Sequence, residues 1–392
     1  METVLYRVHE HVAKIVLRNS SRRARVVIEY ALLLLAISAT MVLTHFHVKY
    51  ATISGREYNL LEMKEKMSMH GGGEKSLKIN PKEVTVVQFF IRTSPQVDDT
   101  CGTRPENAGG GRYTFTFTKG IADMSAADRS ALNIKHVEVD VHTFENGTLA
   151  GWSDMNLWLL NSHIGYDTII INAMIAQYEG QGFVHSSRSN KTHDLNYAAE
   201  FHESISQGVV SVMVFKLGIF IATTFILFTI STVINFTLRE TQQKMLLFTN
   251  VVQHRLRHRQ YFVQAVVKHA LESLVFAPVT IGVFIFMSGV YVDNLTAFGM
   301  MTLMWCCELF SVLSLRTTFS IQFFPRVFCA YFFLFHTYFF SYPYGYSYMA
   351  FGALVCWISH SMWFFWSRYE LSAIEKGIIT ERAPRAAVGG MI

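Results

Sequence analysis

Long apolar runs divide this chain of 392 residues, with one run near the start and five in the second half. A helix needs about 20 apolar residues to cross the hydrocarbon core of a bilayer. We therefore expect six transmembrane helices, at Val26–Phe46, Val209–Phe236, Leu271–Tyr291, Ala297–Leu315, Val327–Phe340 and Tyr348–Trp366. The fifth run is short unless its helix begins near Ile321.

A polar stretch of domain size, from His47 to Ser206, separates the first run from the second. Three of its segments alternate apolar with polar residues, which indicates half-buried strands. They are Glu83–Ile91, Arg112–Thr118 and Ile134–His142, and a short helix is expected at Ala122–Ala131. The pattern of Ile164–Glu179 leaves strand and helix open. The fold class expected is an α-helical membrane protein with one inserted lumenal β-rich, β-sandwich-like domain.

Basic residues gather beside the apolar runs, and their placement predicts the topology. They precede the first run, fill the links after the second and fourth, and follow the sixth: Arg22, Arg23, Arg25, Arg255, Arg257, Arg259, Lys268, Arg316, Arg326, Arg368, Lys376, Arg382 and Arg385. The links 292–296 and 341–347 contain no Lys or Arg. Because short cytoplasmic loops are enriched in Lys and Arg, both termini are expected in the cytosol and the polar domain on the far side.

Seven parts follow from this pattern. They are a cytosolic segment (1–25), a first transmembrane helix (26–46), a lumenal domain (47–207), a second transmembrane helix (208–236), a cytosolic amphipathic link (237–270), a four-helix membrane region (271–366) and a cytosolic tail (367–392). Apolar residues recur at helical spacing in the link, as expected for a helix on the leaflet surface. A plain extension of the neighbouring helices fits that spacing equally well.

Composition and motifs argue against several classes of function. Only 16% of the residues are charged and the net charge is +5, spread beside the spans, so no nucleic-acid surface is indicated. We find no zinc-protease motif, no Cys-x-x-Cys pair and no nucleophile elbow, and therefore predict a protein that is not an enzyme and holds no metal or cofactor.

Polar residues inside the expected spans are the candidate functional contacts, because each is costly in hydrocarbon. They are Glu29, Lys216, Glu308, His336 and His360. Lys216 can extend its ammonium group to the membrane surface. Glu308 lies in the middle of its span, and we expect a packing hydrogen bond to Ser311, His336 or His360 or, alternatively, a wet cavity.

Two glycosylation sequons fall in the polar domain, at Asn146 and Asn190. They are compatible with a compartment of the secretory pathway. Cys101 is the single cysteine of this domain, so it is expected to be free rather than part of an internal disulfide.

Three stretches carry a family resemblance. They are His163-Ile-Gly-Tyr-Asp-Thr-Ile169, Phe333-Leu-Phe-His-Thr-Tyr-Phe-Phe-Ser-Tyr-Pro-Tyr344 and the segment from His360-Ser-Met362 to Tyr369-Glu-Leu-Ser-Ala-Ile374. Together with the order of the spans they resemble membralin, a multi-spanning protein of the endoplasmic reticulum. The chain departs from animal relatives because it lacks their long Pro-rich cytosolic tail and acidic lumenal insertion, so contacts made by those parts are not carried over.

The resemblance implies a non-catalytic scaffold and client adaptor in endoplasmic-reticulum-associated degradation. Its partners would be the lipid bilayer, a RING-type ubiquitin ligase, a membrane protein with a ubiquitin-like domain, and membrane-protein clients. Two alternatives stay open from the residues alone. One is a transporter or channel with Glu308 and His336 along its path, and the other is an accessory subunit of another large assembly, including a mitochondrial one.

Overall fold

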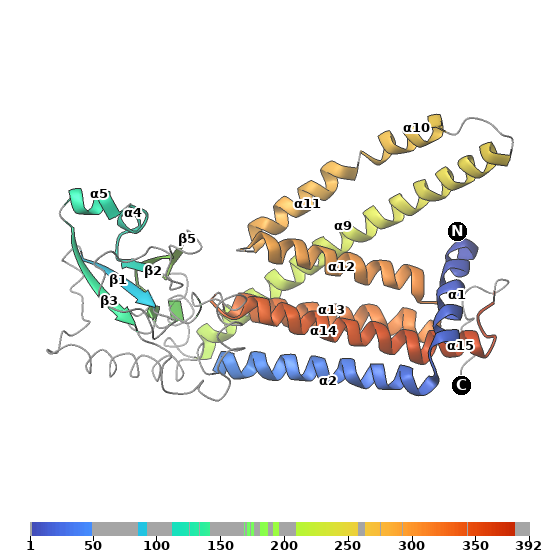
Figure 1. The fold of residues 1–392 in the computed structure, drawn as a ribbon, viewed down its shortest axis with the longest axis horizontal. Coiled ribbons are helices and arrows are strands. Elements are labelled where there is room, and N and C mark those ends of the chain that lie inside the picture. The colour runs from blue at the N-terminus through green and yellow to red at the C-terminus, as the bar shows by residue number, and fades with distance from the viewer. Residues whose placement is uncertain are drawn as a thin grey trace, which may run out of the picture. The chain divides into compact units, whose positions relative to one another are not determined.

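The computed structural model of the chain is drawn in Figure 1. It describes residues 2–48, 85–91, 112–124, 126–132, 134–141, 168, 171–172, 174–175, 181–186, 191–195, 209–257, 263–274, 276–291, 293–342 and 344–380. The chain folds as two compact units. Unit 1 comprises Met1–Met41, Ile219–Tyr338 and Ala350–Ile392, and unit 2 comprises Val42–Gly218 and Phe339–Met349.

Helices make up the part of unit 1 that the structure describes, and several of them continue into unit 2. Their bounds are α1 Glu2–Asn19, α2 Arg22–Phe46, α9 Val209–Arg257, α10 Val263–Ser273, α11 Phe276–Val290, α12 Asn294–Ser314, α13 Thr318–Ser341, α14 Ser347–Phe365, the π-helix η3 Trp366–Glu370, and α15 Leu371–Glu375. Among the described residues five segments are long and apolar enough to cross a membrane: α2, Val209–Thr241, α12, α13 and Ser347–Glu375. The expected multi-pass helical architecture is thus confirmed.

The expected third span is the exception. The range Leu271–Tyr291 covers the end of α10, a break in the helix, and α11. Within α11 the apolar segment Ile281–Val290 is too short to count among the five spans. Pro278 explains the break, because proline has no N–H to offer the carbonyl of residue 274 and its ring would clash with that carbonyl. The sequence predicted one spanning helix here, and the described chain contains two short ones.

Aromatic side chains join the helices of unit 1. Helix α13 packs against α12 through Phe324 and Phe310, whose ring centroids lie 5.0 Å apart, and against α14 through Phe335 and Phe351 at 6.3 Å. Helix α12 also approaches α14 closely at Gly299, where an added Cβ would lie 2.9 Å from the ring of Phe351. Because a side chain there would collide with that ring, glycine sets the spacing of these two helices.

Helices α2 and α9 also contact the helices of unit 1 described above. The indole nitrogen of Trp357 in α14 donates to the hydroxyl of Thr40 in α2, at 2.9 Å. Phe220 of α9 meets Phe333 of α13 edge to face. Helix α9 continues unbroken to Arg257, so the first part of the expected amphipathic link is an extension of the second span, and α10 is the separate helix.

The described part of unit 2 contains one five-stranded sheet of order β3-β1-β2-β4-β5. The strands are β1 Thr85–Ile91, β2 Arg112–Thr116, β3 Lys135–Val141, β4 Phe183–Ser186 and β5 Lys191–Asp194, and two short helices, α4 Lys119–Ala122 and α5 Ala126–Ala131, precede β3. The three expected strands thus correspond to β1, β2 and β3. The hairpin of β4 and β5 was not expected.

The sheet does not confirm a β-sandwich. Strand β1 pairs with β3 in parallel, with Val87 opposite Val137, and the other three pairings are antiparallel. A sandwich needs two sheets packed face to face, and the described residues contain a single sheet. The parallel pairing requires a crossover, which α4 and α5 occupy, and this is typical of helices combined with a mixed sheet.

Tyr113, Phe115, Val184 and Leu195 are the buried apolar residues of β2, of β4 and of the position after β5, and Thr114 and Thr116 on the other face of β2 are buried as well. Gly182 stands at the entry to β4 with a φ of 106°, and an added Cβ would lie 2.8 Å from the ring of Phe115. Its carbonyl accepts the backbone amide of Leu195 at 3.0 Å, which closes the hairpin. Both the backbone conformation and the close ring make glycine necessary here.

Candidate functional site

Glu308 is buried where α12 faces α9. The hydroxyl of Ser231 in α9 donates to a carboxylate oxygen of Glu308 at 3.2 Å, and the glutamate is 7% exposed. The sequence predicted that Glu308 forms a hydrogen bond that packs helices together, and its bond with Ser231 is one of this kind. Its partner is a serine of another helix, however, and not Ser311, His336 or His360. The pair joins two spans.

His336 is fully buried in α13 and is hydrogen-bonded through both ring nitrogens. Its Nδ1 lies 2.6 Å from the carbonyl oxygen of Phe332, and a carbonyl can only accept, so Nδ1 carries the proton. Its Nε2 then accepts the hydroxyl of Tyr291, the residue that follows α11. The two hydrogen bonds hold the imidazole in place and tie α13 to the end of α11.

Two further intramembrane candidates, His360 and Lys216, lie apart from these pairs. His360 of α14 stacks with Phe364, with centroids 6.2 Å apart, and meets Trp357 edge to face. In unit 2, the ammonium group of Lys216 donates to the hydroxyl of Ser341 at 3.1 Å and lies 5.8 Å from the ring centroid of Tyr342. Lys216 therefore reaches the last residue of α13, as its long side chain allows.

The expected glycosylation sites Asn146 and Asn190 lie outside the described residues, as does Cys101. Among the described residues, no group of three or more His, Cys, Asp or Glu side chains could hold a metal ion. The remaining candidates are therefore polar side chains from distant parts of the chain that lie in contact in the structure.

Glu370 forms the largest such group, which we call the Glu370 cluster: Arg316, Thr317, Ser320 and Glu370. The carboxylate accepts the backbone amide of Arg316 at 3.0 Å, the backbone amide of Thr317 at 3.1 Å and the hydroxyl of Thr317 at 2.8 Å. All four residues are at most 1% exposed. These amides directly precede α13 and are accepted by a residue 53 positions away, while the helix itself is capped by the hydroxyl of Thr317, which accepts the amide of Ser320.

The π-helix η3 places Glu370 in this position. Its five residues widen the helix between α14 and α15, and such single-turn insertions recur at functional sites because they redirect one side chain. Ser320 completes the cluster: the hydroxyl of Thr317 lies 2.8 Å from that of Ser320 and accepts its backbone amide at 3.3 Å.

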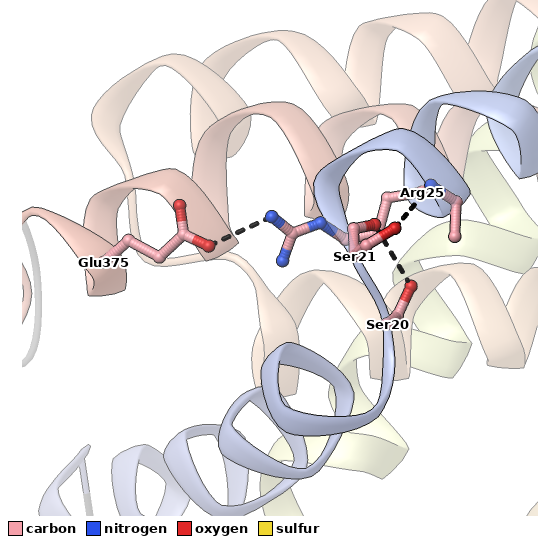
Figure 2. Close-up of polar contacts among 5 residues, drawn as sticks. Ser20, Ser21, Arg25 and Glu375 are labelled. Atoms are coloured by element: carbon pink, nitrogen blue, oxygen red, sulfur yellow. Dashed lines mark hydrogen bonds and ion pairs between the residues drawn. The ribbon is translucent and has the colours of Figure 1, made fainter.

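Two ion pairs join the start of α2 to the end of the last span. Arg368 donates to Glu29 through two guanidinium nitrogens, at 2.8 and 3.0 Å. Arg25, which is 6% exposed, donates to Glu375 at 3.0 Å (Figure 2). The indole of Trp363 also donates to the backbone carbonyl of Arg25 at 3.1 Å. The start of α2 is therefore fixed by three separate contacts.

Helix α1 packs on the same end of unit 1. Tyr6, His9 and Ala13 are buried at helical spacing, and the hydroxyl of Tyr6 reaches the carbonyl of Ile379 beyond α15. Ser21, the residue between the helices, accepts the amide of Ala24 at 3.2 Å and caps α2 (Figure 2). Burial, together with the positive charge of Arg316, lowers the pKa of His9 from 6.5 to about 4.

Unit 2 has a second set of contacts, around the loop between α13 and α14. The amide of Asn172 donates to the carbonyl of Tyr344 at 2.9 Å, and the hydroxyl of Tyr344 donates to the carbonyl of Asp194 at the end of β5. The ring of Phe46 at the end of α2 meets Tyr346 of the same loop. The loop thus touches the sheet and the last residue of α2, although it was expected to be a plain hairpin turn.

Sequence reasoning found Glu308 and His336 because a charged or polar side chain within an apolar run is visible. It missed Glu370, Arg316 and Thr317, which lie in links between runs and look like ordinary solvated residues there. Two signals were available in the sequence. One is the Thr-x-x-Ser pattern at Thr317 and Ser320, which can cap a helix, and the other is a carboxylate four residues after the sixth run.

Apolar spans, polar pairs buried between them and a folded polar domain inserted in the chain define a multi-pass membrane protein in contact with lipid. No protein-family model matches the chain, and no solved structure matches it. It is 37% identical over 264 residues to a membralin-like protein of Arabidopsis thaliana. This similarity covers 67% of the chain and 42% of the plant protein.

The similarity confirms the resemblance that the three sequence stretches indicated: the chain is a relative of the membralin-like proteins. It spans about two fifths of the length of the curated relative that it matches. Two of the three stretches contribute to the sites described above. The second supplies His336 and Tyr344, and the third supplies Arg368 and Glu370.

Proposed function

We propose that this chain is a non-catalytic membrane scaffold and client adaptor for a ubiquitin-ligase complex of the endoplasmic reticulum. Its partners would be a RING-type ligase and a membrane protein with a ubiquitin-like domain, and its clients would be other membrane proteins. The observation that carries the proposal is the similarity to a membralin-like protein over 264 residues, combined with the role that the membralin resemblance implies.

The proposed topology puts both termini in the cytosol. Its support is that the start of α2, the link between α12 and α13 and the segment after α14 meet at one end of unit 1. These are the same segments in which Arg and Lys residues gather. Since short basic links favour the cytosolic side, that end of unit 1 is the cytosolic end in this proposal, and the polar domain is lumenal.

Several buried polar groups favour a scaffold over a conducting path. Glu308 is bonded to Ser231, and both ring nitrogens of His336 are occupied by Tyr291 and Phe332. Groups that hold helices together in this way act as links between spans. A transporter site would instead combine such groups with interrupted helices around a central substrate.

A pull-down tests the scaffold role. The full chain, tagged at one terminus and extracted from its native membranes in a mild detergent, should enrich a RING-type ligase and a ubiquitin-like-domain protein over an unrelated multi-pass protein of equal abundance. Preparations that repeatedly contain no component of the ubiquitin pathway would contradict the scaffold role.

A glycosidase digest tests the compartment. Treatment with an endoglycosidase should increase the gel mobility of the full chain, and the variant Asn146→Gln/Asn190→Gln should run at the digested position before treatment. A chain carrying no glycan at either position, found in purified mitochondria, would instead favour the accessory-subunit alternative.

A further inference from the structure

Helix α1 carries two exposed stripes of different chemistry beside its packed face. The packed face is Tyr6, His9 and Ala13. The basic stripe is Arg7, His11, Lys14 and Arg18, all exposed and spaced by four, three and four residues, so they follow one side of the helix. The apolar stripe is Val12 and Ile15, 46% and 47% exposed, three residues apart.

This helix is tied to the end of a membrane span. Only Ser20 and Ser21 separate α1 from α2, and α2 begins at Arg22. Ser20 donates its backbone amide to the carbonyl of Val16 at 2.8 Å, which completes the last turn of α1, and Ser21 caps α2. Because α2 enters the hydrocarbon within its first turns, the C-terminal end of α1 lies at the level of the membrane surface.

The orientation of α1 is consistent with a position at the membrane surface. In Figure 1 α1 runs across the ends of α2 and α14 rather than alongside them. The contact of Tyr6 with Ile379 holds α1 against the segment after α15, and that of Arg25 with Glu375 fixes the start of α2 beside it. A helix that crosses the ends of spanning helices lies in the plane of the bilayer surface.

We infer that α1 is an interfacial helix that binds the anionic headgroups of the adjoining leaflet through Arg7, His11, Lys14 and Arg18, while Val12 and Ile15 enter the lipid. Basic residues on one side and large aliphatic residues on another are the pattern of helices that lie in an interface. Arg22 and Arg23, both exposed at the start of α2, continue the basic surface beyond the turn.

Lys14 contributes charge despite its partner. It forms an ion pair with Glu10 at 2.8 Å, and its side chain keeps 67% of its exposure. Arg18 lies one turn further along, at the end of α1 nearest to α2. The stripe therefore carries net positive charge along its length, and a single basic residue near an anionic surface changes affinity by about fivefold.

A lipid titration tests the charge. The purified full chain in a neutral detergent would be titrated with phosphatidylserine or phosphatidylcholine, and bound lipid counted by native mass spectrometry. We expect preferential uptake of phosphatidylserine, reduced at least fivefold in Lys14→Gln/Arg18→Gln. The matched control Lys119→Gln/Lys191→Gln removes two exposed lysines of unit 2 and should bind as the unaltered chain does. Equal loss in both variants, or no preference in the unaltered chain, would overturn the inference.

A fluorescence measurement tests the depth. An environment-sensitive fluorescent amino acid is encoded at position 12 or at position 11 of the full chain, which is placed in nanodiscs containing phosphatidylserine. Position 12 should be quenched by a nitroxide on the lipid tails, and position 11 mainly by aqueous iodide. Iodide quenching of equal strength at both positions would place α1 in water and refute the inference, even if the headgroup preference were present.

Discussion

The carboxylate of Glu370 accepts both the backbone amide and the hydroxyl of Thr317, which lies 53 residues earlier in the chain. A buried carboxylate thus accepts the backbone amides that directly precede α13. Losing it would leave two buried amides without this acceptor.

We therefore expect Glu370→Ala to destabilise the chain by about 2–3 kcal/mol. Glu370→Gln keeps one acceptor oxygen and should lose about half as much. Thermal unfolding in detergent measures both, with exposed Lys376→Gln as the control. Equal melting temperatures for Glu370→Ala and the control would show that the hydrogen bonds of Glu370 contribute nothing to stability.

The pair of Tyr291 and His336 is suited to a double-mutant cycle. Tyr291→Phe leaves Nε2 of His336 without this donor, and His336→Phe leaves the phenol without its acceptor, so each change should cost about 1–2 kcal/mol. The double variant should cost about 1 kcal/mol less than the sum. Both residues have further contacts, so the coupling energy is the decisive quantity, and strict additivity would refute the bond.

Reversing the ion pair of Glu29 and Arg368 tests the joint between the first and last spans. Glu29 is 7% exposed and Arg368 is 43% exposed by side chain. Since water screens the arginine, we expect Arg368→Glu to cost about 1–3 kcal/mol and Glu29→Arg/Arg368→Glu to recover part of it. Stability of the purified chain is the measurement. A double variant no better than the worse single one would argue against the pairing.

The buried histidine of α1 predicts a pH dependence. The pKa of His9 is lowered from 6.5 to about 4 by burial and by Arg316, so between these values the unfolded chain holds a proton that the folded chain does not. The stabilisation is fully present above about pH 6.5 and is lost as the pH falls toward 4, by at most about 3 kcal/mol.

Melting temperatures of the unaltered chain and of His9→Gln, compared from pH 7 to pH 4.5, isolate this contribution from that of the carboxylates. The unaltered chain should lose more stability than the variant on acidification. Parallel curves would mean that His9 titrates normally in the folded state.

The loop contact of unit 2 gives a prediction for the polar domain. Asn172 is 1% exposed and donates to the carbonyls of Tyr344 and Thr168, at 2.9 and 2.7 Å. Asn172→Leu removes two buried donations and should speed proteolysis of the polar domain severalfold, whereas Tyr344→Phe, which loses one bond to Asp194, should have a smaller effect. Identical cleavage rates for all three chains would contradict the anchoring role of the loop.

Hydropathy predicted most spans because lipid requires about 20 apolar residues at each crossing, and alternation predicted β1, β2 and β3. The hairpin escaped because β4 has four residues and β5, Lys191–Asp194, is largely polar. Glu308 was expected to find a partner, but which one depends on how each helix is rotated, and Ser231 lies 77 residues away. The role of Glu370 was not predicted either, because its partners lie in a distant link and depend on how the helices pack.

The joint between Glu29 and Arg368 has a consequence for biosynthesis. The two residues are 339 positions apart, so at roughly 5–20 residues per second the ribosome needs on the order of half a minute between them. During that time α2 is in the bilayer with a glutamate whose partner has not been made. The joint between α2 and the last span can therefore close only after η3 has been made, when nearly the whole chain has been synthesised.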